Sequence, residues 1–277
     1  MSIADKILYL NDTKQAIKEA IETKSGITIA DEDTFRSYVD RIDEMVLEDP
    51  VNLEQLRFYQ SIVDGTISGD IIVPDSVTCF GDSTFARNTG ITSVIFHDSV
   101  ISFGSYLFEQ SNVKYVQFPS WLTEIPPYCF YFARRIYNNS QSEWNRFKRV
   151  GKNAFSYSEL KDMSGFTSLI YIEDCGFQSC KFTVANLPNI KTIEKQAFAS
   201  NYNLTTVNIG NKIESIATPS SSYDRVFYSC SKLTTINIDK PFGSLEVPAD
   251  HWGATNSTIY WNDGVQTPPN ESVNKVI

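Results

Sequence analysis

The sequence predicts an α+β protein in which an N-terminal helical hairpin precedes a solenoid of about seven repeats, each 21–29 residues long, with a parallel β-sheet on one face. Two observations predict this fold class. In the middle of the chain, a pair of apolar residues three apart, followed five residues later by Phe, recurs every 21 to 25 residues. Ahead of this region, apolar residues recur at helical spacing.

The repeat has seven copies, and six of them keep the five-residue gap to Phe. The copies lead to Phe85, Phe108, Phe130, Phe155, Phe177, Phe198 and Phe227, which we call the ladder Phe residues. A second motif, apolar-x-x-apolar-x-apolar, follows five or six residues after each Phe and is clearest at 91–96, 113–118, 204–209 and 233–238. Its last four residues alternate as in a strand. In the last copy, Ile213–Phe227, residues 217–222 lengthen the gap, and their Pro and Ser content predicts an exposed loop in an intact repeat.

A single repeat cannot fold alone. About six buried apolar side chains at roughly 1.5–3 kcal/mol each do not offset the backbone entropy of some 23 residues at about 1–2 kcal/mol each. Stacked repeats share their core, so the period predicts a solenoid. Residues 71–74 look like a starting strand, residues 258–264 like a closing strand, and the tail from Val265 is expected to be extended.

The first 50 residues predict two short amphipathic helices. The apolar stripe of the first consists of Ile3, Ile7, Leu10, Ile17 and Ile21, and that of the second includes Phe35, Val39 and Ile42. Helices of this length do not persist alone in water, so they must pack on each other, on the solenoid or on copies in a homo-oligomer. The predicted organisation is a helical attachment or oligomerisation segment at 1–50, a solenoid at 51–250, and a C-terminal cap and tail at 251–277.

Composition excludes several classes of protein. The net charge is −9, and residues 1–50 hold 12 Asp and Glu against 6 Lys and Arg, which argues against nucleic acid as a partner. No apolar stretch is long enough for membrane insertion. Residues 1–6 lack a basic, apolar leader, so no signal peptide is expected. Five Cys without a CxxC pair indicate neither a disulfide framework nor a zinc site.

The repeats resemble a known family. The segments 150–155, 177–180 and 227–233 match the pattern V-x-x-I-G-x-x-A-F-x-x-C-x-x-L of BspA-like leucine-rich repeats, and the likeness extends over roughly residues 62–250. This resemblance implies a leucine-rich-repeat solenoid. Because such solenoids serve as interaction scaffolds on many proteins, it implies little about the partner.

Two further segments resemble bacteriophage proteins. Residues 8–18 and 33–38 are similar to the N-terminal segment of tail, baseplate and fibre proteins, and residues 251–260 look like the ending of phage-borne repeat proteins. These resemblances imply a virion structural protein that is attached by residues 1–50 to other virion proteins and displays the solenoid.

The sequence contains no motif that predicts catalysis. His97 and His251 have no ligand-spaced partner, and no nucleophile elbow, P-loop or dinucleotide fingerprint occurs. The carboxylates are scattered rather than paired. We therefore expect a protein that is not an enzyme and has no catalytic residues, metal or cofactor.

Two surfaces are candidates for partner binding. A solenoid commonly binds on its strand face, whose outward positions include Ile95, Tyr115, Gln117, Asn208 and Asn237. The alternative is that these side chains only keep the face soluble. The second candidate is the irregular stretch 134–149, which loses the strand motif and contains Arg135, Tyr137, Trp144 and Arg146. Here the alternative is that Trp144 fills the gap left by the missing strand.

The function expected from the sequence is that of a non-enzymatic virion component of a bacteriophage tail, baseplate or fibre. It would be assembled in the host cytoplasm, with a host-surface protein or glycan as a candidate partner. The alternative is a bacterial cell-surface adhesin that uses the same repeats. A carbohydrate-active enzyme on a β-solenoid is a third hypothesis, and it lacks the clustered carboxylates that it would need.

Overall fold

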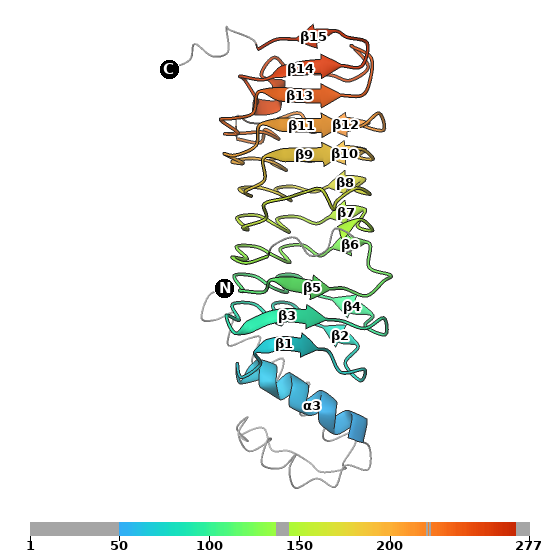
Figure 1. Cartoon of the computed structure of the whole chain (residues 1–277), viewed down its shortest axis with the longest axis vertical. Coiled ribbons are helices and arrows are strands. Elements are labelled where there is room, and N and C mark those ends of the chain that lie inside the picture. Colours follow the sequence, from blue (N-terminus) through green and yellow to red (C-terminus); the bar gives the residue numbers. More distant parts are fainter. Residues whose placement is uncertain (1–49, 137–143, 220, 222, 270–277) are drawn as a thin grey trace. The chain divides into compact units, whose positions relative to one another are not determined.

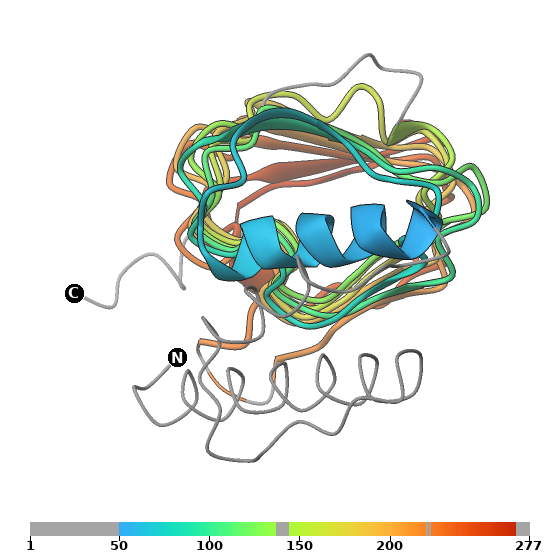
Figure 2. The same cartoon turned by 90° about the horizontal axis from the view of Figure 1, so that it is seen from below.

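The computed structural model describes residues 50–136, 144–219, 221 and 223–269. The chain divides into two compact units, residues 1–58 and 59–277. The second unit contains a series of similar coils that stack on one another (Figure 1). Seen end-on in Figure 2, successive coils of this unit superpose, so equivalent residues lie one above another. The predicted β-solenoid of repeats with parallel sheets is therefore confirmed.

The long strands of the coils form the first column of the solenoid. It consists of two sheets, β1-β3-β5 and β9-β11-β13-β14-β15, and all pairs are parallel except β14 with β15. The bounds are β1 Gly69–Ile72, β3 Ile91–Ile95, β5 Tyr115–Gln117, β9 Val184–Leu187, β11 Thr206–Ile209, β13 Thr235–Ile238, β14 Thr258–Trp261 and β15 Gln266–Thr267. The predicted starting and closing strands are thus confirmed, and the strand β15 in the tail pairs with the closing strand.

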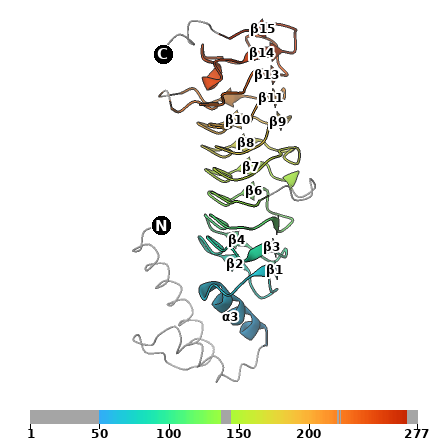
Figure 3. The ribbon, with the colours of Figure 1, turned by 60° about the vertical axis from the view of Figure 1, so that its left-hand side comes forward.

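A second column of two-residue strands runs along another edge of the coils (Figure 3). Its members are β2 Cys79–Phe80, β4 Ser102–Phe103, β6 Glu124–Ile125, β7 Arg149–Val150, β8 Tyr171–Ile172, β10 Thr192–Ile193 and β12 Ser215–Ile216. They form the parallel sheets β2-β4 and β12-β10-β8-β7-β6. The prediction of a sheet on one face was incomplete, because the paired apolar residues that open each repeat also form ladder hydrogen bonds from coil to coil.

The third edge of each coil is a turn face centred on a ladder Phe. In the turns of Phe85, Phe108, Phe130, Phe155, Phe177 and Phe198, the residues two before and two after the Phe have φ between 54° and 61°. This left-handed conformation is costly for non-Gly residues. It is maintained because eleven of these twelve residues donate their backbone N–H to the next coil, as Tyr157 does to the Gln178 carbonyl at 2.8 Å.

The ladder Phe residues stack continuously through the core. Their ring centroids are 5.1–5.9 Å apart from coil to coil, and all seven rings are at most 1% exposed. Phe227 continues the stack beyond Phe198 at 5.9 Å. The repeat Ile213–Phe227 is therefore intact, and residues 217–222 are an insertion, of which 220 and 222 lie outside the described residues.

A helix, α3 Pro50–Val63, precedes the first strand. Pro50 suits the first helical position, and Gly65, with φ of +68°, follows the end of the helix in the left-handed conformation. The sequence prediction placed the solenoid at residues 51–250, and in the structure the first solenoid strand begins at Gly69. The predicted helical hairpin lies outside the described residues, as do all eight residues of its attachment face: Ile3, Ile7, Leu10, Ile17, Ile21, Phe35, Val39 and Ile42.

Candidate ligand-binding groove on the strand face

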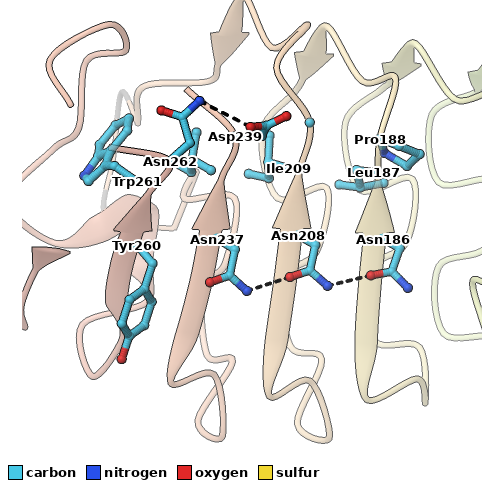
Figure 4. Close-up of a pocket in the computed structure, with 12 residues that line it drawn as sticks. Asn186, Leu187, Pro188, Asn208, Ile209, Asn237, Asp239, Tyr260, Trp261 and Asn262 are labelled. Carbon is cyan, nitrogen blue, oxygen red and sulfur yellow. Dashed lines mark hydrogen bonds between the residues drawn. The ribbon is translucent and has the colours of Figure 1, made fainter. Parts of the chain in front are cut away.

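A groove of about 460 Å³ crosses β9, β11, β13 and β14 near their carboxyl ends. Outward side chains alternate with buried ones along each strand. Because the strands are in register, outward residues of equal position form columns along the sheet. Two such columns flank the groove in Figure 4: Asn186, Asn208, Asn237 and Tyr260 in one, and Pro188, Asp239 and Asn262 in the other. Gly210 also lines the groove and precedes Asp239 by one coil in the second column.

The asparagines of the first column form a hydrogen-bonded ladder. Asn237 Nδ2 donates to Asn208 Oδ1 at 2.7 Å, and Asn208 Nδ2 donates to Asn186 Oδ1 at 2.6 Å (Figure 4). The ladder has a direction, with the Asn186 amide group at one end and the Asn237 oxygen at the other. Aligned hydrogen bonds polarise one another, so these two terminal groups are a strengthened donor and a strengthened acceptor.

Tyr260 extends the asparagine column by one strand. It is the register partner of Asn237, and its side chain is 39% exposed. The adjoining Trp261 is buried, and its indole N–H donates to the Thr267 hydroxyl of β15 at 3.1 Å. The turn back into β15 thus holds β14 in place and leaves the Tyr260 ring at the end of the groove.

The second column contains a close approach of two coils and a polar pair. Gly210 has no side chain, and a Cβ built there would lie 2.0 Å from the Pro188 carbonyl oxygen, so only glycine permits this approach of the two coils. One coil further, Asn262 Nδ2 donates to Asp239 Oδ1 at 3.3 Å. The groove therefore offers amide, carboxylate and aromatic groups above a mostly apolar base. This arrangement suits binding and orientation of a ligand.

The comparisons with known proteins identify the repeats. A family model described as "BspA type Leucine rich repeat region (6 copies)" matches residues 66–164 and 132–249. The chain belongs to this family. A comparison with curated proteins finds no match.

Two solved structures are similar to the chain. The pneumococcal vaccine antigen PcpA is 18% identical with a TM-score of 0.45, over 67% of this chain and 54% of that one. A leucine rich cell surface protein from Faecalibacterium prausnitzii A2-165 is 17% identical with a TM-score of 0.25, over 64% of this chain and 33% of that one. The BspA-type chain thus spans about half the length of the first protein and a third of the second.

The BspA-type repeats bring together part of the predicted strand-face set. Asn208 and Asn237 lie side by side in the groove. Ile95, Tyr115 and Gln117 belong to the separate sheet β1-β3-β5, where Tyr115 is hydrogen-bonded to Gln117 at 3.3 Å. These three side chains are only partly exposed and do not line the groove. Whether any of the five binds a partner stays a prediction.

In the irregular stretch 134–149, the side chain of Trp144 lies in the hydrophobic core. Trp144 is 2% exposed, and its ring lies 5.1–6.1 Å from those of Phe130, Phe147, Phe155 and Phe166. It fills the space left by the missing strand, as the alternative interpretation expected, and almost none of its surface is exposed to a partner. Whether other residues of this stretch bind a partner stays a prediction.

Two of the predicted residues of this stretch, Arg146 and Arg135, differ in their surroundings. Arg146 donates to the backbone carbonyls of Phe118 at 2.8 Å and Leu122 at 3.2 Å, which gives its guanidinium group a structural role. Arg135 is exposed, and Tyr137 lies outside the described residues.

The second strand column carries outward charged and aromatic side chains that contact one another from coil to coil. Arg149 hydrogen-bonds the Glu173 carboxylate at 2.8 Å, and its guanidinium carbon lies 4.2 Å from the centre of the Tyr171 ring. The hydrogen bond from Tyr171 to the Glu194 carboxylate, together with burial, raises the pKa of Tyr171 to about 12. These contacts tie neighbouring coils together.

Sequence reasoning missed several groove residues, namely Asn186, Asp239, Tyr260 and Asn262. Asn186 lies in a degenerate copy of the strand motif, in which Ala185 replaces a larger apolar residue. Aligning residues 182–187 with 204–209 would have placed Asn186 beside Asn208. Among the described residues, no group of three His, Cys, Asp or Glu side chains could hold a metal ion. No helix in the same part of the chain is long and apolar enough to cross a membrane.

Proposed function

We propose that this BspA-type repeat protein is a non-enzymatic, adhesin-type binding protein of a bacterial cell surface, and that it holds a host-surface glycan in the strand-face groove. The observation that carries the proposal is the asparagine ladder with Tyr260 beside it in the groove. Each amide group both donates and accepts hydrogen bonds, as saccharide hydroxyl groups do. An exposed aromatic ring beside them offers an apolar surface to the carbon-bound face of a sugar.

The frame of the groove favours binding as well. The columns are held by parallel ladder hydrogen bonds on rigid strands. A ligand therefore meets side chains that are already ordered, which lowers the entropic cost of association. The Asn186–Asn208–Asn237 chain uses only one hydrogen of each donating amide group, so a second N–H of Asn208 and Asn237 is available to a ligand.

Binding can be tested with a glycan array and the purified chain. We expect retention of a subset of glycans by the unmodified protein and at least tenfold weaker binding of Tyr260→Ala and Asn237→Ala. Tyr202→Ala is the matched control, because Tyr202 is 57% exposed and does not line the groove. Retention of no glycan, or equal binding by all the variants, would contradict a glycan site in the groove.

A virion component of a bacteriophage tail, baseplate or fibre is the second candidate function. It is supported by the resemblances of residues 8–18, 33–38 and 251–260. The family match runs over residues 66–249 and includes none of these segments. The cell-surface hypothesis is preferred because it requires only the repeats that the family match covers.

The two locations can be distinguished by immunogold labelling of the source culture. Label on cell envelopes supports the adhesin, whereas label on phage particles supports the virion component. If the label is on particles, deletion of residues 1–48 tests their role in attachment to other virion proteins. Normal occupancy of the truncated chain would rule that role out.

A further inference from the structure

The parallel ladder of the second strand column is interrupted between β4 and β6. β4 pairs with β2 and β6 pairs with β7, but β4 and β6 do not pair with each other. In Figure 1 and Figure 3, these two strands stand further apart than β6 and β7. The turn face of the same two coils stays joined, because the Phe108 and Phe130 rings stack with centroids 5.5 Å apart. The coils therefore open at one edge only.

A proline contributes to this interruption. In every other neighbouring pair of the column, the residue after a two-residue strand donates its backbone N–H to the last carbonyl of the preceding strand, as Gly151 does to Ile125 at 3.0 Å. The residue after β6 is Pro126, which has no N–H. Pro126 therefore cannot donate to the carbonyl of Phe103, the last residue of β4.

The interruption leaves backbone groups without partners on both sides. The carbonyl groups of Ile101 and Phe103 correspond in the repeat to those of Thr123 and Ile125, which accept hydrogen bonds from the next coil. Among the described residues, no donor reaches the carbonyl oxygens of Ile101 and Phe103, and no acceptor takes the backbone N–H of Glu124. Unpaired groups of this kind at a sheet edge are a template for pairing with another chain.

A groove of about 360 Å³ lies where the ladder is missing, and we call it the β4/β6 groove. Residues of both strands line it, together with two large apolar side chains, Ile101 and Trp121, which are 69% and 45% exposed. The indole N–H of Trp121 donates to the Val100 carbonyl at 2.9 Å, and its ring lies 6.3 Å from that of Phe103. Exposed apolar side chains beside unpaired backbone groups indicate a surface that binds a polypeptide.

The charges at the groove favour a basic residue in the bound segment. Glu124 is exposed, and its register partner on β7, Arg149, hydrogen-bonds the Glu173 carboxylate at 2.8 Å. A strand placed between β4 and β6 would put one outward side chain between Ser102 and Glu124. Since opposite charges on neighbouring strands stabilise a sheet, a lysine at this place fits best.

We propose that the β4/β6 groove binds an extended peptide segment, which adds as a parallel strand between β4 and β6 and carries a lysine flanked by apolar residues. Its N–H groups donate to the carbonyls of Ile101 and Phe103, and one of its carbonyls accepts the N–H of Glu124. Its apolar residues face inward beside Phe103 and Ile125. In strand addition of this kind, main-chain hydrogen bonds supply affinity and alternate side chains supply specificity.

This site is separate from the strand-face groove. The two grooves have no lining residue in common. The proposal therefore does not depend on the glycan site.

The test uses the full chain and a fluorescein-labelled peptide, Ser-Val-Lys-Val-Ser, with binding followed by fluorescence anisotropy. One control is the same peptide with N-methyl groups on the amides of the lysine and the last serine. The backbone N–H groups of Arg149 and Gly151 donate to the preceding coil, and the same pattern assigns these two peptide N–H groups to the Ile101 and Phe103 carbonyls. A second control peptide has glutamate in place of lysine.

The diagnostic variant is Ile101→Arg. Because Ile101 is 69% exposed, the substitution leaves the core intact, and a long cationic side chain obstructs the groove and repels the lysine. Ile72→Arg is the matched control, since Ile72 is 76% exposed and does not line the groove. Thermal unfolding of each variant verifies that the fold is retained.

We expect saturable binding of Ser-Val-Lys-Val-Ser to the unmodified chain and to Ile72→Arg, and at least tenfold weaker binding to Ile101→Arg. Both control peptides should bind the unmodified chain at least tenfold more weakly. Absence of saturable binding, equal affinity for either control peptide, or equal affinity of Ile101→Arg would overturn the proposal. So would loss of glycan-array binding in Ile101→Arg, because the groove would then hold a saccharide.

Discussion

Replacement of Phe155 by alanine probes the stack of ladder Phe residues at its centre. The Phe155 ring is fully buried and stacks on Phe130 at 5.1 Å and on Phe177 at 5.3 Å. It also meets the edges of Trp144 and Phe166 at 5.7 and 5.6 Å. Because the neighbouring coils are held by ladder hydrogen bonds and cannot collapse into the space, a cavity remains.

The expected cost of Phe155→Ala is about 3–5 kcal/mol in the free energy of unfolding, the range for Phe truncation in a packed core. Two lost stacked pairs at about 0.5–1.5 kcal/mol each are contained in that figure. Since each coil contacts only its neighbours, the loss should be local and should reduce the cooperativity between the two halves of the solenoid.

The assay is urea unfolding followed by tryptophan fluorescence, for which Trp144 is a probe beside the altered site. Hydrogen exchange adds a local readout. The amide of Phe130 donates to the Ala154 carbonyl at 2.7 Å and that of Phe155 to the Gly176 carbonyl at 2.9 Å. Both amides should lose protection before those of distant coils.

The matched control is Tyr157→Ser, two residues further along the same turn. Its ring is 43% exposed and loses one stacked contact, with Phe132 at 4.5 Å, so the expected cost is about 1 kcal/mol. A cost below about 1 kcal/mol for Phe155→Ala, or equal costs for the two variants, would refute the argument that the stack holds the coils together.

Three further predictions concern the groove and the cap. Asn208→Ala removes both hydrogen bonds of the amide ladder and should lower the free energy of unfolding by about 1–2 kcal/mol in urea titrations; an unchanged value would mean that the ladder is energetically neutral. Gly210→Ala places a Cβ 2.0 Å from the Pro188 carbonyl oxygen and should lower the free energy of unfolding by about 1–3 kcal/mol, which a urea titration checks. The same variant should bind glycans more weakly on the array, because the two coils that frame the groove must move apart. Burial lowers the pKa of His251, which lies 2.9 Å from the Ser257 carbonyl through Nδ1. The unfolded chain then binds the proton more tightly, so stability should be full above about pH 6.5 and fall below it; unfolding of His251→Gln should lack this fall.

Much of the solenoid could be predicted from the sequence because its stability is periodic. Every coil must bury the same positions against its neighbours, so Phe85 and Phe108 repeat visibly in the chain. The alternation of residues 206–209 likewise predicted a strand with Asn208 outward. The insertion before Phe227 could be recognised because the pattern resumes unchanged after it.

The candidate sites were less predictable, because they depend on the register between coils. The role of Asn186 in the groove depends on its place beside Asn208, and that of Tyr260 on its place beside Asn237, 22 and 23 positions away in the printed sequence. The stacked aromatic residues of the turn face could have been read from the sequence: aligned on the ladder Phe, three successive copies place Tyr106, Tyr128 and Tyr157 two residues before or after it.

The sequence by itself determined the repeat length, the ladder of Phe residues and the long strands, because apolar periodicity directly records which positions a stacked coil must bury. Only the tertiary structure decided that Trp144 lies in the core, since a missing strand leaves a volume whose occupant the local pattern does not name. It also decided the left-handed turns and the two candidate surfaces. Hydrogen bonds between coils impose the turn conformation on non-Gly residues such as Tyr157, and the register of the coils assembles each surface from residues that are distant in the chain.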